Sequence, residues 1–150
     1  MKNMFNEVDK NEILQRTEKL TPESKALWGT MNVAQMLAHC TTGVQMSTGE
    51  LKTTSAPFPF TLLGKLLKGK VLAEGPMRKN SPTAKELKVA DPKDFKVEKA
   101  NFIAIIKKFS EAGEKGSVAE KHPFFGKMTA KEWGRISYKH NDHHLAQFGV

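Results

Sequence analysis

Hydrophobic residues recur every three or four positions along most of this chain, which is the spacing of amphipathic helices. One stripe consists of Val33, Met36, Leu37, Cys40 and Val44. Asn32 and Gln35 have the spacing of a capping box at the start of this stripe, and Gly49 is a suitable residue to end it. The pattern therefore predicts a helix over residues 32–49.

A second stripe predicts a helix over about Asp94 to Ala112. Its apolar positions are Phe95, Phe102, Ile105, Ile106 and Phe109. Gly113 and Gly116 follow directly, and glycine commonly ends helices because it accepts left-handed backbone angles.

The clearest helix start lies near the C-terminus. Thr129-Ala130-Lys131-Glu132 is a full capping box, and Met128 and Trp133 occupy the two positions of a hydrophobic staple. Two independent signals agree on this boundary, so we expect a helix from Thr129 to about Phe148.

Two weaker helix signals occur before residue 32. Asp9 and Glu12 form an acid-rich variant of the capping box. The positions that share a face behind it are Ile13, Thr17 and Leu20. Thr21-Pro22-Glu23 resembles a second start, with proline at the first helical position, and predicts a short helix that ends near Trp28.

Residues 50–93 are predicted to form a long irregular crossover, because they hold five of the seven prolines and many lysines. Phe58 to Lys70 is an exception, since its leucines repeat at helical spacing between lysines. Such a segment can lie on a membrane surface as a basic amphipathic helix, or it can cap one end of the fold or cover a groove. We favour the second interpretation because one or two turns offer little area to a membrane.

Helical periodicity dominates the chain, and no segment shows the two-residue alternation of a half-buried strand. There is no internal repeat and no break in composition, so we expect one domain over residues 1–150. Four amphipathic helices must bury their stripes against each other. The expected fold is all-α: a four-helix bundle with a long irregular crossover between its second and third helices.

The charge changes this picture little. Lysine and arginine total 24 against 16 acidic residues, for a formal net charge of +8, but only Arg16, Arg78 and Arg135 are arginines. Arginine binds phosphate and guanine through its planar fork, and stacking on bases needs aromatic side chains, yet the chain has one tyrosine and two tryptophans. We therefore expect no nucleic-acid partner.

Cys40 is the single cysteine, which excludes an intramolecular disulfide and a cysteine-rich zinc or iron–sulfur site. No run approaches the ~18 apolar residues that cross a bilayer, and the first ten residues lack the apolar stretch of a secretory signal. We expect a cytoplasmic protein with no membrane partner.

The histidines carry the most specific chemistry. On a helical wheel, His140 and His144 lie within about 20° of the centre of the stripe that begins at Trp133. Two imidazoles four residues apart on one buried face can reach a single metal ion. His39 lies at the flank of the stripe on the 32–49 helix and is the candidate for a third ligand. Three protein ligands would leave an open coordination position.

Other interpretations remain for the polar residues around this cluster. Histidines in the last turns of a helix can also be solvated, where their charge suits the helix dipole. His122, in a loop, is expected to have a structural or solvent-facing role, and Cys40 to pack in the core. His143 is a possible general base but is expected to be exposed, and the wheel turns Asn141 and Asp142 away from the stripe.

Three stretches of the chain resemble a known superfamily. They are L-W-G-T-M-N-V-A-Q-M-L-A-H (27–39), H-P-F-F-G-K-M-T-A-K-E-W (122–133) and Y-K-H-N-D-H-H-L-A-Q-F-G (138–149). On these, the chain resembles the DinB/YfiT-like superfamily of small metal-binding four-helix bundles, and more narrowly an uncharacterised branch of it. The resemblance implies a divalent metal held by His39, His140 and His144. It also implies kinship with transferases and isomerases that depend on low-molecular-weight thiols.

These inferences leave two classes of function. The first is an enzyme that uses a divalent metal, with Zn or Ni as the leading candidates, to activate a small thiol for transfer, or to activate water for hydrolysis. The second is a non-catalytic stress protein that binds metal or a small ligand. A small-molecule partner follows from either class. The apolar residues 56–67 also suggest a homodimer.

Overall fold

Most helices of the computed structural model begin where a side chain caps them. The structure describes residues 1–81, 83–116 and 118–150. The predicted capping boxes of Asn32 with Gln35 and of Thr129 with Glu132 are both present, and Asp94 caps a third helix through the backbone N–H of Val97. The first helix starts earlier than predicted, because Asn6 rather than Asp9 accepts the free N–H groups of the first turn.

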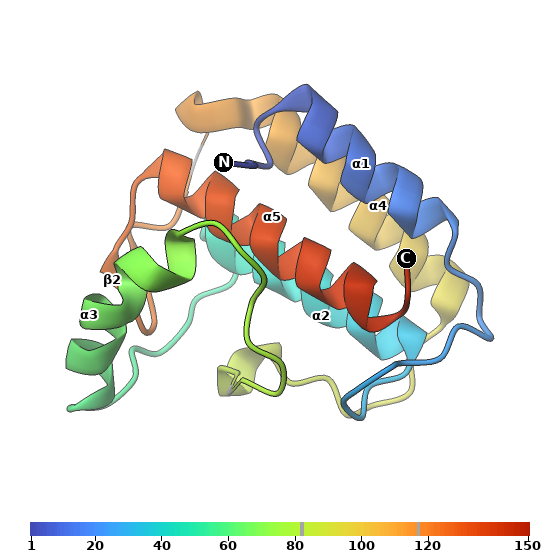
Figure 1. Cartoon of the computed structure of the whole chain (residues 1–150), viewed down its shortest axis with the longest axis horizontal. Coiled ribbons are helices and arrows are strands. Elements are labelled where there is room, and N and C mark those ends of the chain that lie inside the picture. Colours follow the sequence, from blue (N-terminus) through green and yellow to red (C-terminus); the bar gives the residue numbers. More distant parts are fainter. Residues whose placement is uncertain (82, 117) are drawn as a thin grey trace.

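Four of the five α-helices among the described residues form the body of the fold: α1 (Glu7–Glu18), α2 (Val33–Thr48), α4 (Phe95–Ala112) and α5 (Ala130–Gln147). Helix α1 packs on α4 and on α5, and α2 packs on the same two helices. The four contacts close a ring, with α5 lying across α2 and α1 running beside α4 (Figure 1). The predicted all-α class is confirmed.

The core lies inside this ring and contains the predicted stripes. Trp133, Phe102 and Ile106 are at most 1% exposed, and the indole N–H of Trp133 donates to the carbonyl oxygen of Ala119 at 2.6 Å. Burial of a large aromatic side chain with its polar atom satisfied is worth about 3 kcal/mol, so this contact anchors the start of α5.

Two expectations about local structure are wrong. Residues 21–28 form turns and irregular chain rather than a short helix, and Thr21 instead closes a turn through the hydroxyl of Ser24. A small antiparallel hairpin occurs where no strand was predicted, with strands β1 (Lys121–His122) and β2 (Gly126–Lys127). Strands of two residues are too short to show a two-residue alternation.

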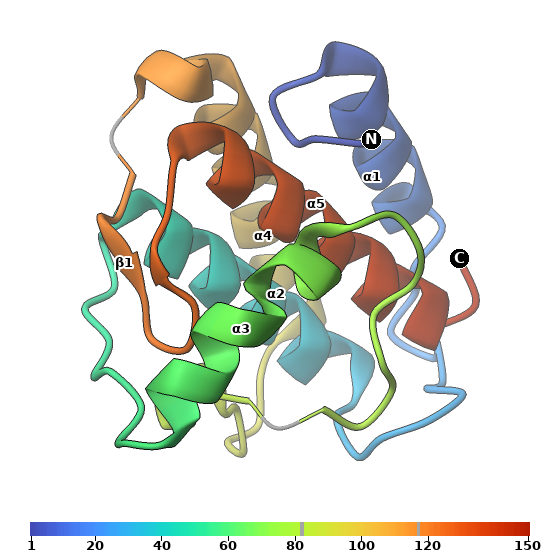
Figure 2. The same ribbon diagram turned by 60° about the vertical axis from the view of Figure 1, so that its left-hand side comes forward.

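The crossover between α2 and α4 contains α3 (Phe60–Leu72) and a single 3₁₀ turn over Lys85–Leu87. Helix α3 approaches the hairpin so closely that a Cβ on Gly64 would stand 2.1 Å from the carbonyl oxygen of Phe124. Figure 2 shows α3 in front of the ring, beside the hairpin. The crossover therefore covers one side of α2 and α5.

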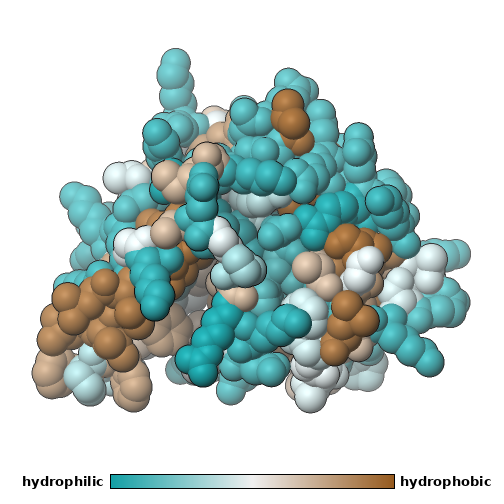
Figure 3. All heavy atoms as spheres, in the orientation of Figure 1, coloured by the Kyte–Doolittle hydropathy of each residue, from teal (hydrophilic) through white to brown (hydrophobic). Residues whose placement is uncertain are grey.

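The outer face of α3 is apolar and exposed. With Phe58, which precedes the helix, the apolar side chains there are 42–81% exposed; those within α3 are Phe60, Leu62, Leu63, Leu66 and Leu67. They form the largest brown area at the lower left of Figure 3. The segment was expected to cap one end of the fold or to cover a groove; it packs on the hairpin instead and leaves its leucines exposed. Among the described residues, none of the helices has both the length and the apolar character needed to cross a membrane.

Candidate metal centre

Three histidines from two helices meet beside the crossover. His39 comes from α2, and His140 and His144 come from successive turns of α5. His39 and His144 are buried, and His140 is partly buried. The ring centroids lie 4.7 to 4.9 Å apart in all three pairs. The structure thus brings together the three residues that the wheel and the spacing selected.

The crossover fixes the tautomer of His39. Nδ1 of His39 lies 2.7 Å from the carbonyl oxygen of Leu87, which can only accept a hydrogen bond. Nδ1 therefore carries the proton, and Nε2 of the neutral ring keeps its lone pair. That nitrogen faces Nε2 of His140 at 2.9 Å. Oriented imidazoles whose second nitrogen donates to a fixed oxygen are typical of metal ligands.

Gln147 fixes the tautomer of His144 in the same way. The amide nitrogen of Gln147 donates to the carbonyl oxygen of Trp28 at 2.6 Å, so its Oε1 is directed at Nδ1 of His144, 2.8 Å away. Because Oε1 can only accept, Nδ1 of His144 is protonated and Nε2 keeps a lone pair. Two of the three rings are thus neutral with the lone pair on Nε2, which in His39 lies 2.9 Å from Nε2 of His140.

Replacing Gln147 with leucine is expected to weaken metal binding by about 10- to 100-fold, because His144 would lose the acceptor that orients it. Competition for Zn(II) with a colorimetric chelator measures this affinity. Gln45→Leu is the matched control, since Gln45 lies on α2 outside the cluster. Equal affinities of the Gln147→Leu and Gln45→Leu variants would contradict the orienting role.

His140 occupies space that a glycine leaves open. A Cβ at position 43 of α2 would stand 3.0 Å from Cε1 and 3.1 Å from Nδ1 of His140. Gly43 follows His39 by four residues, so both lie on the face of α2 that meets α5. The small residue therefore lets the imidazole of His140 approach His39.

The three donors fit a divalent ion. One nitrogen from each ring can be chosen so that all three lie within 4.8 Å of one another. Tetrahedral zinc with Zn–N bonds of about 2.0–2.1 Å requires N···N distances of about 3.4 Å, which lies between the 2.9 Å and 4.8 Å found here. Small side-chain movements would complete the coordination.

The environment keeps these rings neutral. Burial lowers the pKa of His39, lowers the pKa of His140 well below its ordinary value and lowers the pKa of His144 to about 3. The neighbouring imidazoles add to the shift of His140 and His144 because two adjacent positive charges repel. Neutral imidazole is the form that binds metal, so the cluster does not have to lose charge first.

The three rings line an open cleft of about 440 Å³. Its other walls come from Trp28 and Met31 before α2, from His143, and from Arg78 and Lys88 in the crossover. The cleft is open to solvent. A closed structural site would have no such space next to its donors.

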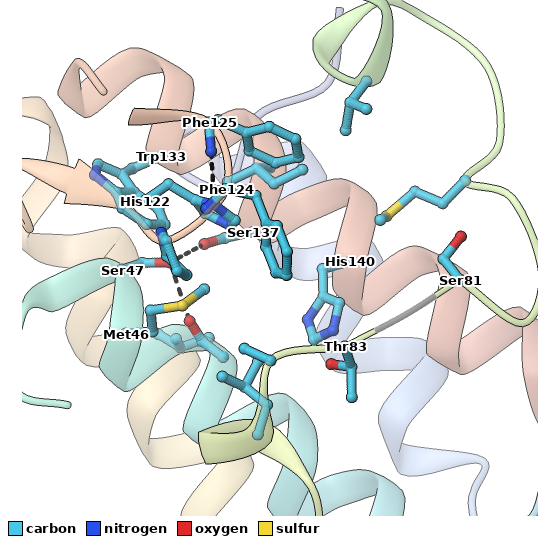
Figure 4. A pocket seen from close by; sticks show the side chains of 18 residues that line it. Met46, Ser47, Ser81, Thr83, His122, Phe124, Phe125, Trp133, Ser137 and His140 are labelled. Carbon is cyan, nitrogen blue, oxygen red and sulfur yellow. Dashed lines mark hydrogen bonds between the residues drawn. The ribbon is translucent and has the colours of Figure 1, made fainter. Parts of the chain in front are cut away.

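A second cavity of about 210 Å³ lies on the other side of His140. Figure 4 shows Thr83 beside His140, and Phe124, Phe125 and Trp133 across the cavity. Its polar atoms include the hydroxyls of Ser47 and Ser137, which are 3.0 Å apart. The cavity is mostly apolar, and His140 is the one candidate ligand among its described lining residues.

His122 has the structural role expected of it. Nδ1 of His122 accepts hydrogen bonds from the backbone N–H groups of Phe124 and Phe125, at 3.1 and 3.3 Å, and its ring stacks on Phe125. Burial lowers its pKa to about 4. His122 therefore holds the turn of the hairpin as a neutral ring.

Acidification from pH 7 to pH 5 is expected to destabilise the metal-free fold. Below about pH 6.5 the unfolded chain binds a proton at position 122, whereas the folded chain does not until about pH 4. This contribution is complete above pH 6.5 and falls by about 2 kcal/mol at pH 5. Asparagine keeps an acceptor at this position but does not titrate, so His122→Asn should lose less stability over the same range. Denaturant unfolding with a chelator present measures both, and equal losses would contradict the assignment.

The other polar residues that the sequence singled out lie outside the cluster of three histidines. Cys40 is buried against Met36, and burial raises the pKa of its thiol, so it packs in the core as expected. Asp142 is turned away and binds Arg16 at 2.6 Å. His143 is half-buried against Trp28, at 5.6 Å between ring centroids, rather than exposed. Asn141 was expected outside the stripe but is fully buried, because α5 packs on α1 as well as on α2.

Sequence reasoning missed the residues that orient the cluster. Gln147 lies one turn after His144, and Gly43 lies one turn after His39, so both could have been found from helical spacing. The carbonyl oxygen of Leu87 and the cleft residues Arg78 and Lys88 lie in the crossover. No periodic signal places those three next to the histidines.

Residues 3–149 match the model of a protein family that is described as "Protein of unknown function (DUF1569)". Comparison with the curated proteins finds no significant match. Comparison with the solved structures finds none either.

Proposed function

We propose that this chain, which belongs to the DUF1569 family, is a divalent-metal-dependent enzyme. Its metal is held by His39, His140 and His144. One observation carries the proposal: all three imidazoles lie within ligand distance of one another and all three line the same open cleft. A site with three protein donors and adjacent space is the arrangement of a catalytic metal rather than a structural one.

The fold supports a finer assignment. The closed order α1, α4, α2 and α5 is compatible with a four-helix bundle, and the three histidines are those that the resemblance to the DinB/YfiT-like superfamily implies. On that basis we propose a transferase that uses a low-molecular-weight thiol. Zn or Ni is the proposed ion, because both suit imidazole ligands.

Each residue has a defined part in this proposal. A bound divalent ion would supply a Lewis acid that favours the deprotonated form of a thiol or of water. Leu87 and Gln147 hold two of the imidazoles in the required tautomer, and Gly43 admits the third.

The proposal is tested with the zinc- or nickel-loaded chain, a small thiol and 1-chloro-2,4-dinitrobenzene. The thiol sulfur forms a bond to the aromatic carbon as chloride leaves and the thiol proton passes to the buffer. We expect turnover that is lost on chelation and in the His140→Ala variant. Metal-dependent hydrolysis of an activated ester without thiol transfer would support the hydrolase alternative. A fully loaded chain with neither activity would favour a non-catalytic metal- or ligand-binding stress protein.

We also propose that the exposed face of α3 associates with a second copy of the chain. Six large apolar side chains exposed on one small surface are more typical of an interface than of free solvent. Sedimentation should give twice the mass of one chain, and Leu62→Glu/Leu66→Glu should reduce it to one. Both positions are exposed, so the double variant should still fold. A wild-type mass of one chain would contradict the dimer.

A further inference from the structure

The cleft beside the histidines has an unusual balance of charge. Arg78 and Lys88 line it, and Lys79 lies next to it with Nζ 4.0 Å from the centroid of the Trp28 ring. No aspartate or glutamate is among its described lining residues. The cleft is therefore positively charged before any metal binds.

These cations have no acidic partner within the part of the chain that the structure describes. The ion pairs there use other basic groups, for example Arg16 with Asp142 and Lys68 with Glu132. Arg78 differs in this from Arg16, whose guanidinium is bound by a carboxylate and by two backbone carbonyls. Arginine presents a planar fork of N–H groups that matches a carboxylate or a phosphate, so its place beside the three histidines favours an anionic ligand.

A bound metal ion would increase the excess of positive charge in the cleft. The three candidate ligands are neutral imidazoles, and the groups behind them are a backbone carbonyl and an amide. The nearest carboxylate on α5, that of Asp142, is held by Arg16. The charge of a divalent ion would thus remain uncompensated by protein and would add to that of Arg78 and Lys88.

We propose that this cleft binds a small organic anion, with its carboxylate or phosphate on Arg78 and Lys88 and its apolar part against Trp28 and Met31. The proposal rests on the proposed metal centre and names the class of substrate that centre takes. Arginine binds either anion through two parallel hydrogen bonds, and a volume of about 440 Å³ admits a ligand with several more heavy atoms. The cavity behind His140, with no charged lysine, arginine or acid in its described lining, offers no such site.

The test uses the full chain loaded with Co(II), whose absorption reports a sulfur ligand directly. Two thiols of equal length serve as probes: 3-mercaptopropionate, which is anionic, and 3-mercaptopropionamide, which is neutral. We expect the wild-type chain to bind the anionic thiol at least tenfold more tightly at physiological salt. Arg78→Gln/Lys88→Gln should reduce that preference to less than threefold and leave Co(II) uptake unchanged, since both side chains are exposed.

Lys52→Gln/Lys93→Gln is the matched control, because it removes the same charge from exposed positions outside the cleft and should keep the preference. Propionate and inorganic phosphate are then compared as competitors, and the stronger one identifies the group that the cleft prefers. Equal affinity of the two thiols, or no displacement by a large excess of either anion, would overturn this inference alone. A chain that takes up no Co(II) would overturn the proposed function and this inference with it.

Discussion

Replacing His140 with alanine is expected to abolish the binding of Zn(II) or Ni(II) to this chain. His140 lies beside both other members of the cluster: its Nε2 is 2.9 Å from Nε2 of His39, and its ring centroid is 4.7 Å from that of His144. Two remaining imidazoles on different helices cannot hold the ion tightly. Metal per chain after loading and desalting should fall from about one to zero.

The same variant should lose the stabilisation that metal gives the wild-type fold. An ion present at 100 times its dissociation constant adds about 2.7 kcal/mol, which is measured as a rise in Tm on addition of metal. His143→Ala is the matched control, because His143 is the next histidine on α5 but lies against Trp28. It should keep both the metal and the shift. A stoichiometric ion in His140→Ala would remove His140 from the site.

Replacing Gly43 with alanine is expected to weaken metal binding by about 10- to 100-fold without unfolding the chain. The new methyl group would stand 3.0 Å from Cε1 of His140, so the ring must move away from His39. The helix itself should gain up to about 1 kcal/mol, because alanine favours helix over glycine. Zinc competition and thermal unfolding of the metal-free chain measure the two effects separately.

Gly69→Ala provides the comparison for this change. Gly69 lies in α3, and a Cβ there meets no described atom within 4 Å. It should leave metal affinity unchanged. If Gly43→Ala bound zinc as tightly as Gly69→Ala, the close approach of α2 and His140 would have no part in forming the site.

The parts of this molecule that sequence could predict are those that local rules determine. Capping boxes act within four residues, so the starts of α2 and α5 at Asn32 and Thr129 were predicted to the residue. The pairing of His140 with His144 follows from helical spacing, and both helices present apolar stripes that must face each other. The histidine cluster was predictable because its members lie on regular helices.

The rest depends on contacts between distant segments. A helical wheel assumes one buried face, but α5 packs on both α1 and α2, and so Asn141 is buried where the wheel placed it outside. The part of the crossover after α3 has no periodicity, so nothing in the sequence places Leu87 behind His39 or Arg78 in the cleft. Thr21-Pro22-Glu23 satisfies a local rule for a helix start, yet the residues that follow it form turns. These turns pack against the end of α5, where Leu27 donates its backbone N–H to the carbonyl oxygen of Gln147.

The central claim is that His39, His140 and His144 hold a divalent metal ion. It is tested most directly by the metal content, by mass spectrometry, of the full chain purified without a histidine tag or a chelating column. The wild-type chain should carry about one divalent ion, and the variant with all three histidines replaced by alanine should carry none. A wild-type chain that holds no metal, even after Zn(II) or Ni(II) is added, would contradict the claim and leave the three histidines as hydrogen-bonded residues of the core.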